Sequence, residues 1–427
     1  MSDVATATAP RARKITTLAS LNANLQAAIR LIPAEADATT DPIAATRPNA
    51  IFTGQERFDA EQAGIFRKYP VPVTVSALLA EPGSVVAHDG YGVPLLISRT
   101  REGEVKAFIN ACQHKGAKLL EDCEVHKQGR LTCPYHAWTY ELDGRLTGVP
   151  DSASYPSLDK GKAGLVPVDC EVWRGFIFVR LDSGGPSVAA MMAPYEAMVA
   201  PYRFEELTAL GRVTLRPRSV NWKNVGDNYS DGLHIPVAPP GLTRLFGKSY
   251  GVEAEAHVDR MWGDLEDRPS ANWSERMYQK LLPPVPHLPE AGQRHWLYFK
   301  LWPTVAFDIY PDQVDFMQWL PTGPDTCLIR EISYVLPDSY TPDETRREMR
   351  AARYLNWRIN RQVNAEDTAL ITRVQEGMAS RTFSVGPLSD KEVCLRGFAA
   401  KIRQLIPEAR QHHAPPAGWS ATSTPES

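Results

Sequence analysis

Cys112-Gln-His114 and Cys133-Pro-Tyr-His136 are the two stretches that decide the fold of this 427-residue chain. Each supplies one thiol and one imidazole, and 18 residues separate them. Because each loop carries one thiol and one imidazole, the two loops can together hold a [2Fe-2S] cluster in which thiolates bind one iron and imidazoles bind the other. A tetrahedral zinc site is the alternative. Because zinc motifs usually pair like residues, the mixed order favours the cluster.

The composition is that of an ordinary globular protein, long enough for two or three domains, with 43% hydrophobic and 23% charged residues. A net charge of -3 argues against a nucleic-acid surface. No run reaches the roughly 18 apolar residues of a membrane span, and the N-terminus lacks the pattern of a signal peptide. Six cysteines, with motif-like spacing only in the two stretches above, fit a reducing compartment. We therefore expect a cytoplasmic protein without a nucleic-acid or membrane partner.

The pattern of the first half predicts a small antiparallel β domain. Short β-rich runs at 93–97, 105–109 and 176–179 are separated by turn signals such as Asp89-Gly90, so both ligand pairs fall on hairpin tips. The stretch Asp182-Ser-Gly-Gly-Pro186 marks a boundary. Four segments are predicted. Residues 1–45 form an N-terminal arm, helical or mobile, and residues 46–180 form the β domain with its lead-in. Residues 181–413 form a larger domain, and residues 414–427 form a disordered tail.

The second half has a mixed pattern. Strands are predicted over 212–220 and within 296–319, where prolines punctuate aromatic-rich runs. Thr341-Pro-Asp-Glu344 and Ser389-Asp-Lys-Glu392 have the capping pattern of helix starts. The predicted fold class is α+β: a small antiparallel β domain plus a larger mixed α/β domain with a central antiparallel sheet.

Two motifs resemble one known family. The stretches 112–116 and 133–138 are similar to the signature of the Rieske non-haem iron oxygenases, in particular the large subunit of the aromatic-ring-hydroxylating type, with Lys115 where most members carry arginine. The segment Asn221-Trp-Lys-Asn-Val-Gly-Asp-Asn-Tyr-Ser-Asp231-Gly-Leu-His234 resembles the family's mononuclear-iron segment. Two motifs in the expected order, about a hundred residues apart, extend the resemblance over most of residues 50 to 410.

The resemblance implies two metal centres. The implied ligands are Cys112, His114, Cys133 and His136 for a [2Fe-2S] cluster, and His234 and Asp367 for a mononuclear Fe(II). Such an iron uses two histidines and one carboxylate, leaving positions for dioxygen and substrate. Asp231, expected with His234 on one face of a helix, matches the aspartate that bridges to a cluster histidine of the neighbouring subunit. A homotrimer, or an oligomer built on such a trimer, is therefore expected.

The family's second iron-binding histidine is missing. The pattern His-x4-His leads from His234 to Pro239, whose side chain has no lone pair. Three interpretations follow: a lost ligand that disables the iron site, a site completed by another residue such as His257 or Asn228, or a chain kept for electron transfer or assembly. We favour the first, because everything else around the lost ligand is retained, so impaired activity is expected.

The resemblance also implies the reaction and its partners. An NAD(P)H-dependent flavin reductase, with or without a ferredoxin, would pass electrons to the chain, which oxidises a small organic substrate with dioxygen. Large apolar and polar residues alternate over 295–319 and favour a pocket for an aromatic ring, so ring hydroxylation is the first hypothesis. O- or N-demethylation of a small amine or ether is the alternative, since tryptophans also bind cations. A non-catalytic electron carrier or regulatory subunit is the third.

Further residues are candidates for function. Asp231 and Asn228 are the candidate catalytic residues beside the implied iron. Basic side chains on or near the cluster loops could attract an acidic electron donor, although a solvated basic face is the better explanation of any one of them: Lys115, Lys118, Lys127 and Arg130.

Overall fold

The computed structural model describes residues 23–35, 46–182, 184–237, 240–380 and 383–410. Most of the predicted N-terminal arm, the predicted tail 414–427 and Pro239 therefore lie outside the described residues. Within the arm, the structure has one helix, α1 (Ala23–Leu31). A short antiparallel pair joins β1 (Thr46–Pro48) to β19 (Val385–Pro387), so the start and the end of the described core lie together.

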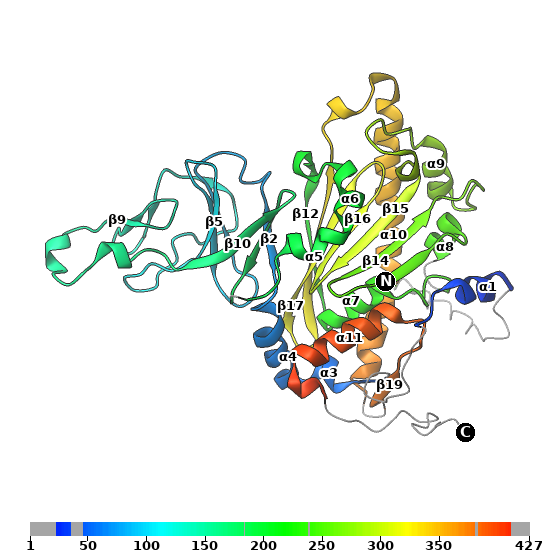
Figure 1. The fold of residues 1–427 in the computed structure, drawn as a ribbon, viewed down its shortest axis with the longest axis horizontal. Helices are drawn as coiled ribbons and strands as arrows, with labels where there is room; N and C mark the ends of the chain where they lie inside the picture. The colour runs from blue at the N-terminus through cyan, green and yellow to red at the C-terminus, as the bar shows by residue number, and fades with distance from the viewer. Residues whose placement is uncertain (1–22, 36–45, 183, 238–239, 381–382, 411–427) are drawn as a thin grey trace, which may run out of the picture.

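The smaller domain is an all-antiparallel β structure. Its main sheet has seven strands in the order β2-β11-β10-β5-β4-β3-β6, and a second sheet has the order β7-β8-β9. The bounds are β2 Val71–Val75, β3 Ser84–His88, β4 Leu95–Arg99, β5 Val105–Ile109, β6 His126–Lys127, β7 Leu131–Thr132, β8 Thr139–Tyr140, β9 Leu146–Gly148, β10 Pro167–Trp173 and β11 Phe176–Arg180. In Figure 1 the strand β9 lies at the far tip of this domain.

The larger domain is built on a second seven-stranded antiparallel sheet, with the order β12-β18-β17-β16-β15-β14-β13. Its strands are β12 Thr208–Arg218, β13 Gly251–Ala254, β14 Val258–Asp264, β15 His295–Leu301, β16 Val305–Ile309, β17 Val314–Gly323 and β18 Thr326–Val335. The predicted α+β class, with an antiparallel sheet in each of two domains, is thereby confirmed.

Successive residues of this sheet face opposite layers, as the two-residue period of a strand requires. On β15, Leu297 and Phe299 pack in a core with residues of two short helices, α5 (Val188–Met192) and α6 (Glu196–Val199). Trp296 and Tyr298, the alternate positions, belong to a different core on the other face. That second face carries the candidate catalytic site.

Helices cover the second face and the base of the sheet (Figure 1). They are α3 Ala50–Thr53, α4 Gln55–Glu61, α7 Trp222–Ser230, α8 Pro240–Phe246, α9 Trp273–Leu281, α10 Arg346–Met378 and α11 Val393–Leu405. Among the described residues, none of these helices is both long and apolar enough to cross a membrane.

The two predicted capping segments precede the helices α10 and α11, but each helix begins later than its capping pattern predicts. A 3-10 turn over Asp343–Thr345 precedes α10, so the α-helix begins at Arg346 and not directly after Thr341. Before α11, the Ser389 backbone N–H donates to the Glu392 carboxylate (2.5 Å), and the Lys391 N–H donates to the Ser389 hydroxyl (3.2 Å). The capping box is therefore formed, although the helix begins only after its glutamate.

Polar contacts and a shared core fix the two domains to each other. Gln318 of β17 donates to the Pro72 carbonyl of β2 (2.8 Å), and Arg330 of β18 donates to Nε2 of His88 (2.9 Å). Burial lowers the pKa of His88 to about 3, so its ring is a neutral acceptor. Around these contacts one apolar core joins residues of both domains. The smaller domain is thus held in a defined orientation on the larger sheet.

Candidate functional site

Two tight turns bring the four predicted cluster residues together. In the first, the Gly116 N–H donates to the Cys112 carbonyl (2.8 Å), and in the second the Ala137 N–H donates to the Cys133 carbonyl (3.0 Å). Gly116 and Ala137 have φ values of 75° and 55°, the left-handed conformation that closes such turns. The rings of His114 and His136 consequently lie 4.6 Å apart, centroid to centroid.

The chemistry of these four side chains fits a [2Fe-2S] cluster. Cys112 and Cys133 are 2% and 3% exposed. The Nδ1 atoms of His114 and His136 are buried and have no hydrogen-bond partner, a costly state for polar atoms unless a metal binds them. Two thiols and two unpartnered imidazole nitrogens are the donor set of the mixed-ligand cluster. They are the residues that would hold it, and the cluster would store one electron at a time.

Neighbouring aromatic rings support the cluster loops. Trp138 is buried and stacks on His114, with ring centroids 5.0 Å apart and planes within 7°. The Tyr140 hydroxyl lies 3.3 Å from Cys112 Sγ and accepts a hydrogen bond from the Gln113 N–H (2.9 Å). Sequence reasoning missed Tyr140, whose only signal was its place on the strand after the second motif.

The basic side chains near the cluster do not form an unpaired patch. Three of them are ion-paired with acidic partners: Lys118 with Asp89, Lys127 with Glu81 and Arg130 with Glu141. The fourth, Lys115, lies 5.7 Å from the centre of the Tyr135 ring. Because Tyr135 is 62% exposed, Lys115 and Tyr135 together present a cation and an aromatic ring to solvent beside His136.

The second site lies where α7 ends, and here one sequence-based expectation was wrong. Asp231 and His234 were expected on one helical face, but the helix stops at Ser230 and residues 232–237 form turns. The Asp231 carboxylate accepts a hydrogen bond from the Leu233 N–H (2.8 Å). This side-chain turn competes with helical hydrogen bonding and ends the helix.

His234, in the turn after α7, and Asp367 of α10 lie close together although 132 residues lie between them in sequence. His234 Nε2 lies 3.8 Å from Asp367 Oδ1, and His234 Nδ1 lies 3.3 Å from Asp231 Oδ2. Burial disfavours the imidazolium, but Asp231 and Asp367 outweigh it and raise the pKa of His234. Burial raises the pKa of Asp367 to about 6, against the opposing effects of His234 and a hydrogen bond with Asn228.

These side chains fit an iron ion only in part. Asp367 Oδ1 is buried without a hydrogen-bond partner, so it and His234 Nε2 are two donors aimed at one point. Around His234 and Asp367, the described residues offer no further His, Cys, Asp or Glu side chain that completes a group of three able to hold a metal ion. The described residues therefore present two of the three protein donors that a facial triad uses.

The two proposed substitutes for the missing histidine lie in different places. The ring of His257 accepts a hydrogen bond from Lys401 (2.9 Å) and packs against Tyr69, away from the lining of the catalytic cavity. Asn228 lines that cavity and hydrogen-bonds with Asp367. Of the two, only Asn228 is placed to contribute an oxygen beside the iron ligands.

Buried polar contacts hold α7 in position. Lys300 of β15 donates to the Gly226 carbonyl (3.1 Å) and to the Ser230 hydroxyl (2.5 Å). Near the start of the helix, Asn224 donates to the Gln375 side chain of α10 (2.8 Å). Because these groups are almost fully buried, removing any of them leaves an unsatisfied partner, which typically costs about 1–3 kcal/mol.

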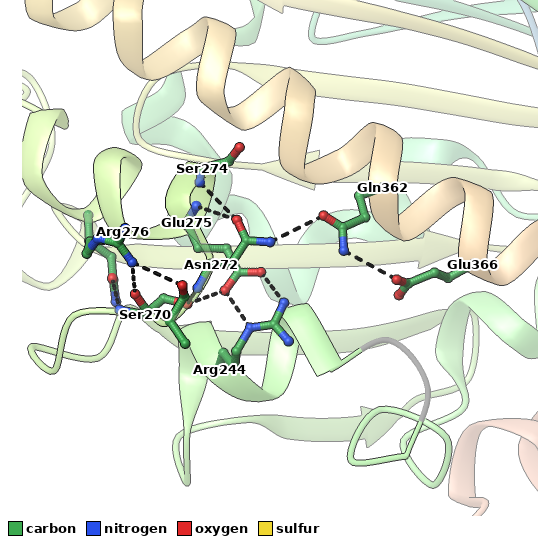
Figure 2. A network of polar contacts seen from close by, with 10 residues as sticks. Arg244, Ser270, Asn272, Ser274, Glu275, Arg276, Gln362 and Glu366 are labelled. Atoms are coloured by element: carbon green, nitrogen blue, oxygen red, sulfur yellow. Dashed lines mark hydrogen bonds and ion pairs between the residues drawn. The ribbon is translucent and has the colours of Figure 1, made fainter. Parts of the chain in front are cut away.

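A second network anchors α8, the helix that follows Pro239 in sequence. Figure 2 shows Arg244 of α8 pointing to Glu275 of α9, and its Nε lies 2.9 Å from the carboxylate. From the cap of α9, Asn272 donates to Gln362 of α10 (3.4 Å). The chain is thus fixed beyond position 239, and Leu242 of α8 lines the same cavity as His234.

The cavity beside His234 and Asp367 has a volume of about 330 Å³, the size of a small-molecule site. One row of residues crosses the sheet at directly paired positions and forms its floor: Met261, Tyr298, Asp308, Asp315, Ser333 and Leu210. Side chains of α10 form the opposite wall, from Trp357 and Asn360 to Asn364 and Asp367. The iron ligands lie at one end of this space.

Sequence reasoning missed the two acids in this floor. Asp308 accepts hydrogen bonds from the hydroxyls of Tyr229 and Tyr310, and Asp315 accepts from Gln313 (2.7 Å) and Asn360 (3.0 Å). Burial raises the pKa of each carboxyl to about 7. The signal in the sequence was a lone carboxylate inside each of two strands, one otherwise apolar and one mostly apolar.

The predicted aromatic pocket is found only in part. Tyr298, Tyr310 and Phe316 line the cavity, whereas Phe299 and Phe307 belong to the core on the opposite side of the sheet. The aromatic rings that face the cavity are mainly tyrosines, and Tyr229 and Tyr250 add to them. The wall is thus more polar than a pocket for an unsubstituted ring requires.

The fold and the two candidate centres define an oxygenase component with an iron-sulfur domain and a catalytic domain. The model of the Rieske [2Fe-2S] domain matches residues 70–159, and that of the ring hydroxylating alpha subunit (catalytic domain) matches residues 204–408. The chain belongs to the Rieske oxygenases, a family of oxidoreductases with monooxygenases and dioxygenases. The two domains imply a [2Fe-2S] cluster and a mononuclear iron.

Its relatives include enzymes named for quaternary amines. The carnitine monooxygenase oxygenase subunit of Escherichia coli K12 is 29% identical over 343 residues, 79% of this chain and 85% of that protein. The glycine betaine monooxygenase oxygenase subunit of Pseudomonas aeruginosa is 31% identical over 199 residues, 46% of this chain and 45% of that protein. A solved quaternary ammonium Rieske monooxygenase has the same fold, with a TM-score of 0.69 at 23% identity, covering 86% of this chain and 97% of that one.

Proposed function

We propose that this chain is the oxygenase component of a Rieske system that oxidises a small, positively charged amine at a carbon attached to nitrogen. Hydroxylation at such a carbon gives a product that splits into a carbonyl compound and an amine. The relatives named for carnitine and glycine betaine support this alternative over ring hydroxylation. A flavin reductase, with or without a ferredoxin, is the proposed electron source.

The observation that carries the substrate class is the tyrosine wall of the catalytic cavity. Tyr229, Tyr250, Tyr298 and Tyr310 all line it together with His234 and Asp367. Burial raises the pKa of these four tyrosines, so their rings are uncharged at neutral pH. Neutral electron-rich rings attract quaternary ammonium groups by cation–π interaction, each contact contributing about 0.5–2 kcal/mol.

Electron transfer between subunits is part of the proposal, and the placement of the two candidate centres supports it. The sheet β7-β8-β9, which adjoins Cys133 and His136, projects away from α7 and α10 (Figure 1). The solved quaternary ammonium monooxygenase is described as showing inter-subunit electron transfer. We expect the same here in a homotrimer, with Asp231 as the contact to a neighbour's cluster histidine. Asp231 already lies 3.3 Å from His234 and is partly exposed.

Substrate class can be tested on a version of the chain with a complete ligand set, the variant Pro239→His, supplied with a reductase. We expect trimethylammonium compounds to stimulate oxygen uptake and to release an aldehyde, measured by derivatisation and mass spectrometry. Aromatic acids should do neither. Incorporation of both oxygen atoms of dioxygen into an aromatic acid would contradict the proposal and support ring dihydroxylation.

In the same background, Asp231→Asn is expected to lower turnover by about 10- to 100-fold, the usual effect of losing a partner of a metal-bound histidine. Stopped-flow reduction of the cluster should keep its rate, because Asp231 lies on the iron side. The iron content of the variant is the control, since it separates slow electron transfer from weak metal binding. Unchanged turnover would remove the bridging role from Asp231.

A second candidate function, a non-catalytic electron carrier or regulatory subunit, is favoured by one observation, the proline at position 239. Against it, the chain keeps His234 and Asp367 converging in a cavity that a carrier does not need. The variant Pro239→His distinguishes the two, because an oxygenase component should gain a third iron and substrate-dependent turnover, whereas a carrier should keep cluster iron alone and never turn over.

A further inference from the structure

Two carboxylates in the floor of the catalytic cavity have no basic partner. Asp308 of β16 and Asp315 of β17 are directly opposite each other on adjacent strands, and both line the cavity. We infer that this pair, called the acid pair below, is the subsite that binds the positively charged group of the substrate, with Asp308 as a specificity-determining residue. The inference rests on the proposed function and names the residues that would recognise the amine.

The charges of the acid pair are unbalanced within the protein. No lysine, arginine or histidine among the described residues lies within 4 Å of either carboxylate as an ion-pair partner, whereas Glu331 in the same cavity is paired with Arg216 (2.9 Å). Like charges at directly opposite positions of two strands destabilise a sheet. A buried charge likewise costs free energy unless it is paired. A cation bound between Asp308 and Asp315 removes both costs.

The hydrogen bonds around the acid pair come from uncharged groups only. The hydroxyls of Tyr229 and Tyr310 donate to Asp308, and the amides of Gln313 and Asn360 donate to Asp315. These donors hold the carboxylates in place without neutralising them. Such an arrangement fixes two negative groups in position for a ligand that brings the positive charge.

Three arginines line the cavity, and none of them forms an ion pair with the acid pair. Arg212 is exposed, and Arg216 is matched by Glu331. The Arg361 guanidinium lies 5.3 Å from the centre of the ring of Trp357. Trp357 is 47% exposed, so this stacked pair lies toward solvent. Arg361 lines the same cavity as Asp308 and is available to the carboxylate of a zwitterionic amine whose ammonium group binds the acid pair.

Tyr229 connects the acid pair to the iron ligands. Its hydroxyl donates to Asp308, and the preceding residue, Asn228, hydrogen-bonds with Asp367. Along α10, Asn360 contacts Asp315 and lies seven residues before Asp367, about 10 Å at the rise of a helix. A carbon attached to the bound nitrogen can therefore lie between the acid pair and His234.

The test measures ligand selectivity in the protein as isolated, with its cluster. The probes are two matched pairs: choline with 3,3-dimethylbutan-1-ol, and glycine betaine with 3,3-dimethylbutanoate. Within each pair the shapes agree and only the cationic nitrogen is replaced by carbon. By calorimetric titration we expect the unaltered chain to prefer the cation in at least one pair. Asp308→Asn should reduce that preference by about tenfold or more, because a unit charge is removed close to the ligand.

Two further variants separate recognition from folding. Asp315→Asn should also reduce the preference, while Asp325→Asn, an exposed acid in the turn between β17 and β18, should leave it unchanged. Thermal unfolding of Asp308→Asn should not shift to lower temperature, since the asparagine oxygen accepts from one tyrosine, its NH2 group can donate to the hydroxyl of the other, and the like-charge repulsion is lost. Retained selectivity in Asp308→Asn, whether or not its melting temperature is lower, would overturn the inference. A lower melting temperature with retained selectivity would assign Asp308 a structural role.

The pH dependence supplies an independent readout. The groups that face the acid pair are Tyr229 of α7, Tyr298 of β15, Tyr310, Glu331 of β18 with its partner Arg216, and Asn360 of α10. Only the ionised carboxylates attract a cation, and burial raises the pKa of Asp308 and Asp315 to about 7. The preference for the cation should therefore rise from pH 6 to pH 8 and rise less in Asp308→Asn. A flat profile in the unaltered chain would contradict the role of the acid pair.

The outcomes distinguish this inference from the proposed function. If the unaltered chain prefers the cationic ligand and Asp308→Asn retains the preference, the acid pair is not the subsite and the proposed function stands. If the unaltered chain prefers neither cation over its carbon isostere, the proposed substrate class itself is wrong, and the inference fails with it.

Discussion

Cys133→Ala is expected to yield a colourless protein, whereas the unaltered chain should be red-brown. The unaltered chain should also show the electron paramagnetic resonance spectrum of a Rieske centre after reduction with dithionite. The physical reason is the donor set: Cys133 is 3% exposed and belongs, with Cys112, to the sulfur half of the site. Removing one thiolate leaves an iron with an open position in a buried loop, and metal binding there is coupled to folding of the loop. Iron content should fall from two per chain to near zero.

Cys123→Ala is the matched control for that experiment. Cys123 lies in the same domain but is exposed and outside both ligand turns, so its substitution should preserve colour, spectrum and iron. Thermal unfolding of the two variants should differ as well, because only Cys133→Ala loses the cluster that joins the two loops. A colourless unaltered protein with stoichiometric zinc would contradict the cluster assignment.

The cluster residues could be predicted from sequence because each pair is local. Cys112 with His114, and Cys133 with His136, are close enough along the chain for one turn to aim both side chains at a metal. The composition of the pairs then distinguishes iron-sulfur from zinc chemistry. His234 and Asp367 are different: His234 lies in the turn after α7 and Asp367 lies in α10, and no local pattern connects them. Only the resemblance to a family suggested that they belong together.

The acid pair shows what local patterns cannot reveal. Asp308 and Asp315 are seven residues apart in a hairpin, and whether they oppose each other depends on the register of β16 and β17. A shift by one residue would turn one of them to the other face of the sheet. The register is set by the apolar residues around them, so the pairing of the two acids becomes visible only in the folded sheet.

The errors at helix ends have a common cause. The segment 231–234 and the segment 341–345 both carry side chains that hydrogen-bond to nearby backbone groups. Such local bonds satisfy the same backbone groups that a helix would use, and in both segments they displaced the helix boundary. Sequence patterns therefore indicate that a helix boundary is near. The competition between local side-chain hydrogen bonds and helical hydrogen bonds determines the residue at which the helix begins or ends.

Pro239→His is expected to raise the iron content of the chain from two to three per protomer. His234 and Asp367 already converge, with Nε2 and Oδ1 3.8 Å apart, and a third donor completes the facial set that binds ferrous iron. Ile235 and Leu242, on either side of position 239 in the chain, both line the cavity that holds these ligands. The described residues before and after position 239 thus lie at the cavity in which His234 and Asp367 would hold the iron. Oxygen uptake that depends on substrate should appear together with the third iron.

Pro239→Ala is the matched control, because it removes the same fixed φ without adding a ligand. It should stay at two irons and remain inactive, and the same is expected of the unaltered chain. Recovery in Pro239→His can be incomplete, since Pro240 still restricts the backbone of the residue before it. Three irons and turnover in the unaltered chain would show that another side chain completes the site. Asn228, which hydrogen-bonds with Asp367, is then the residue to replace: loss of the third iron in Asn228→Ala would identify it as the ligand.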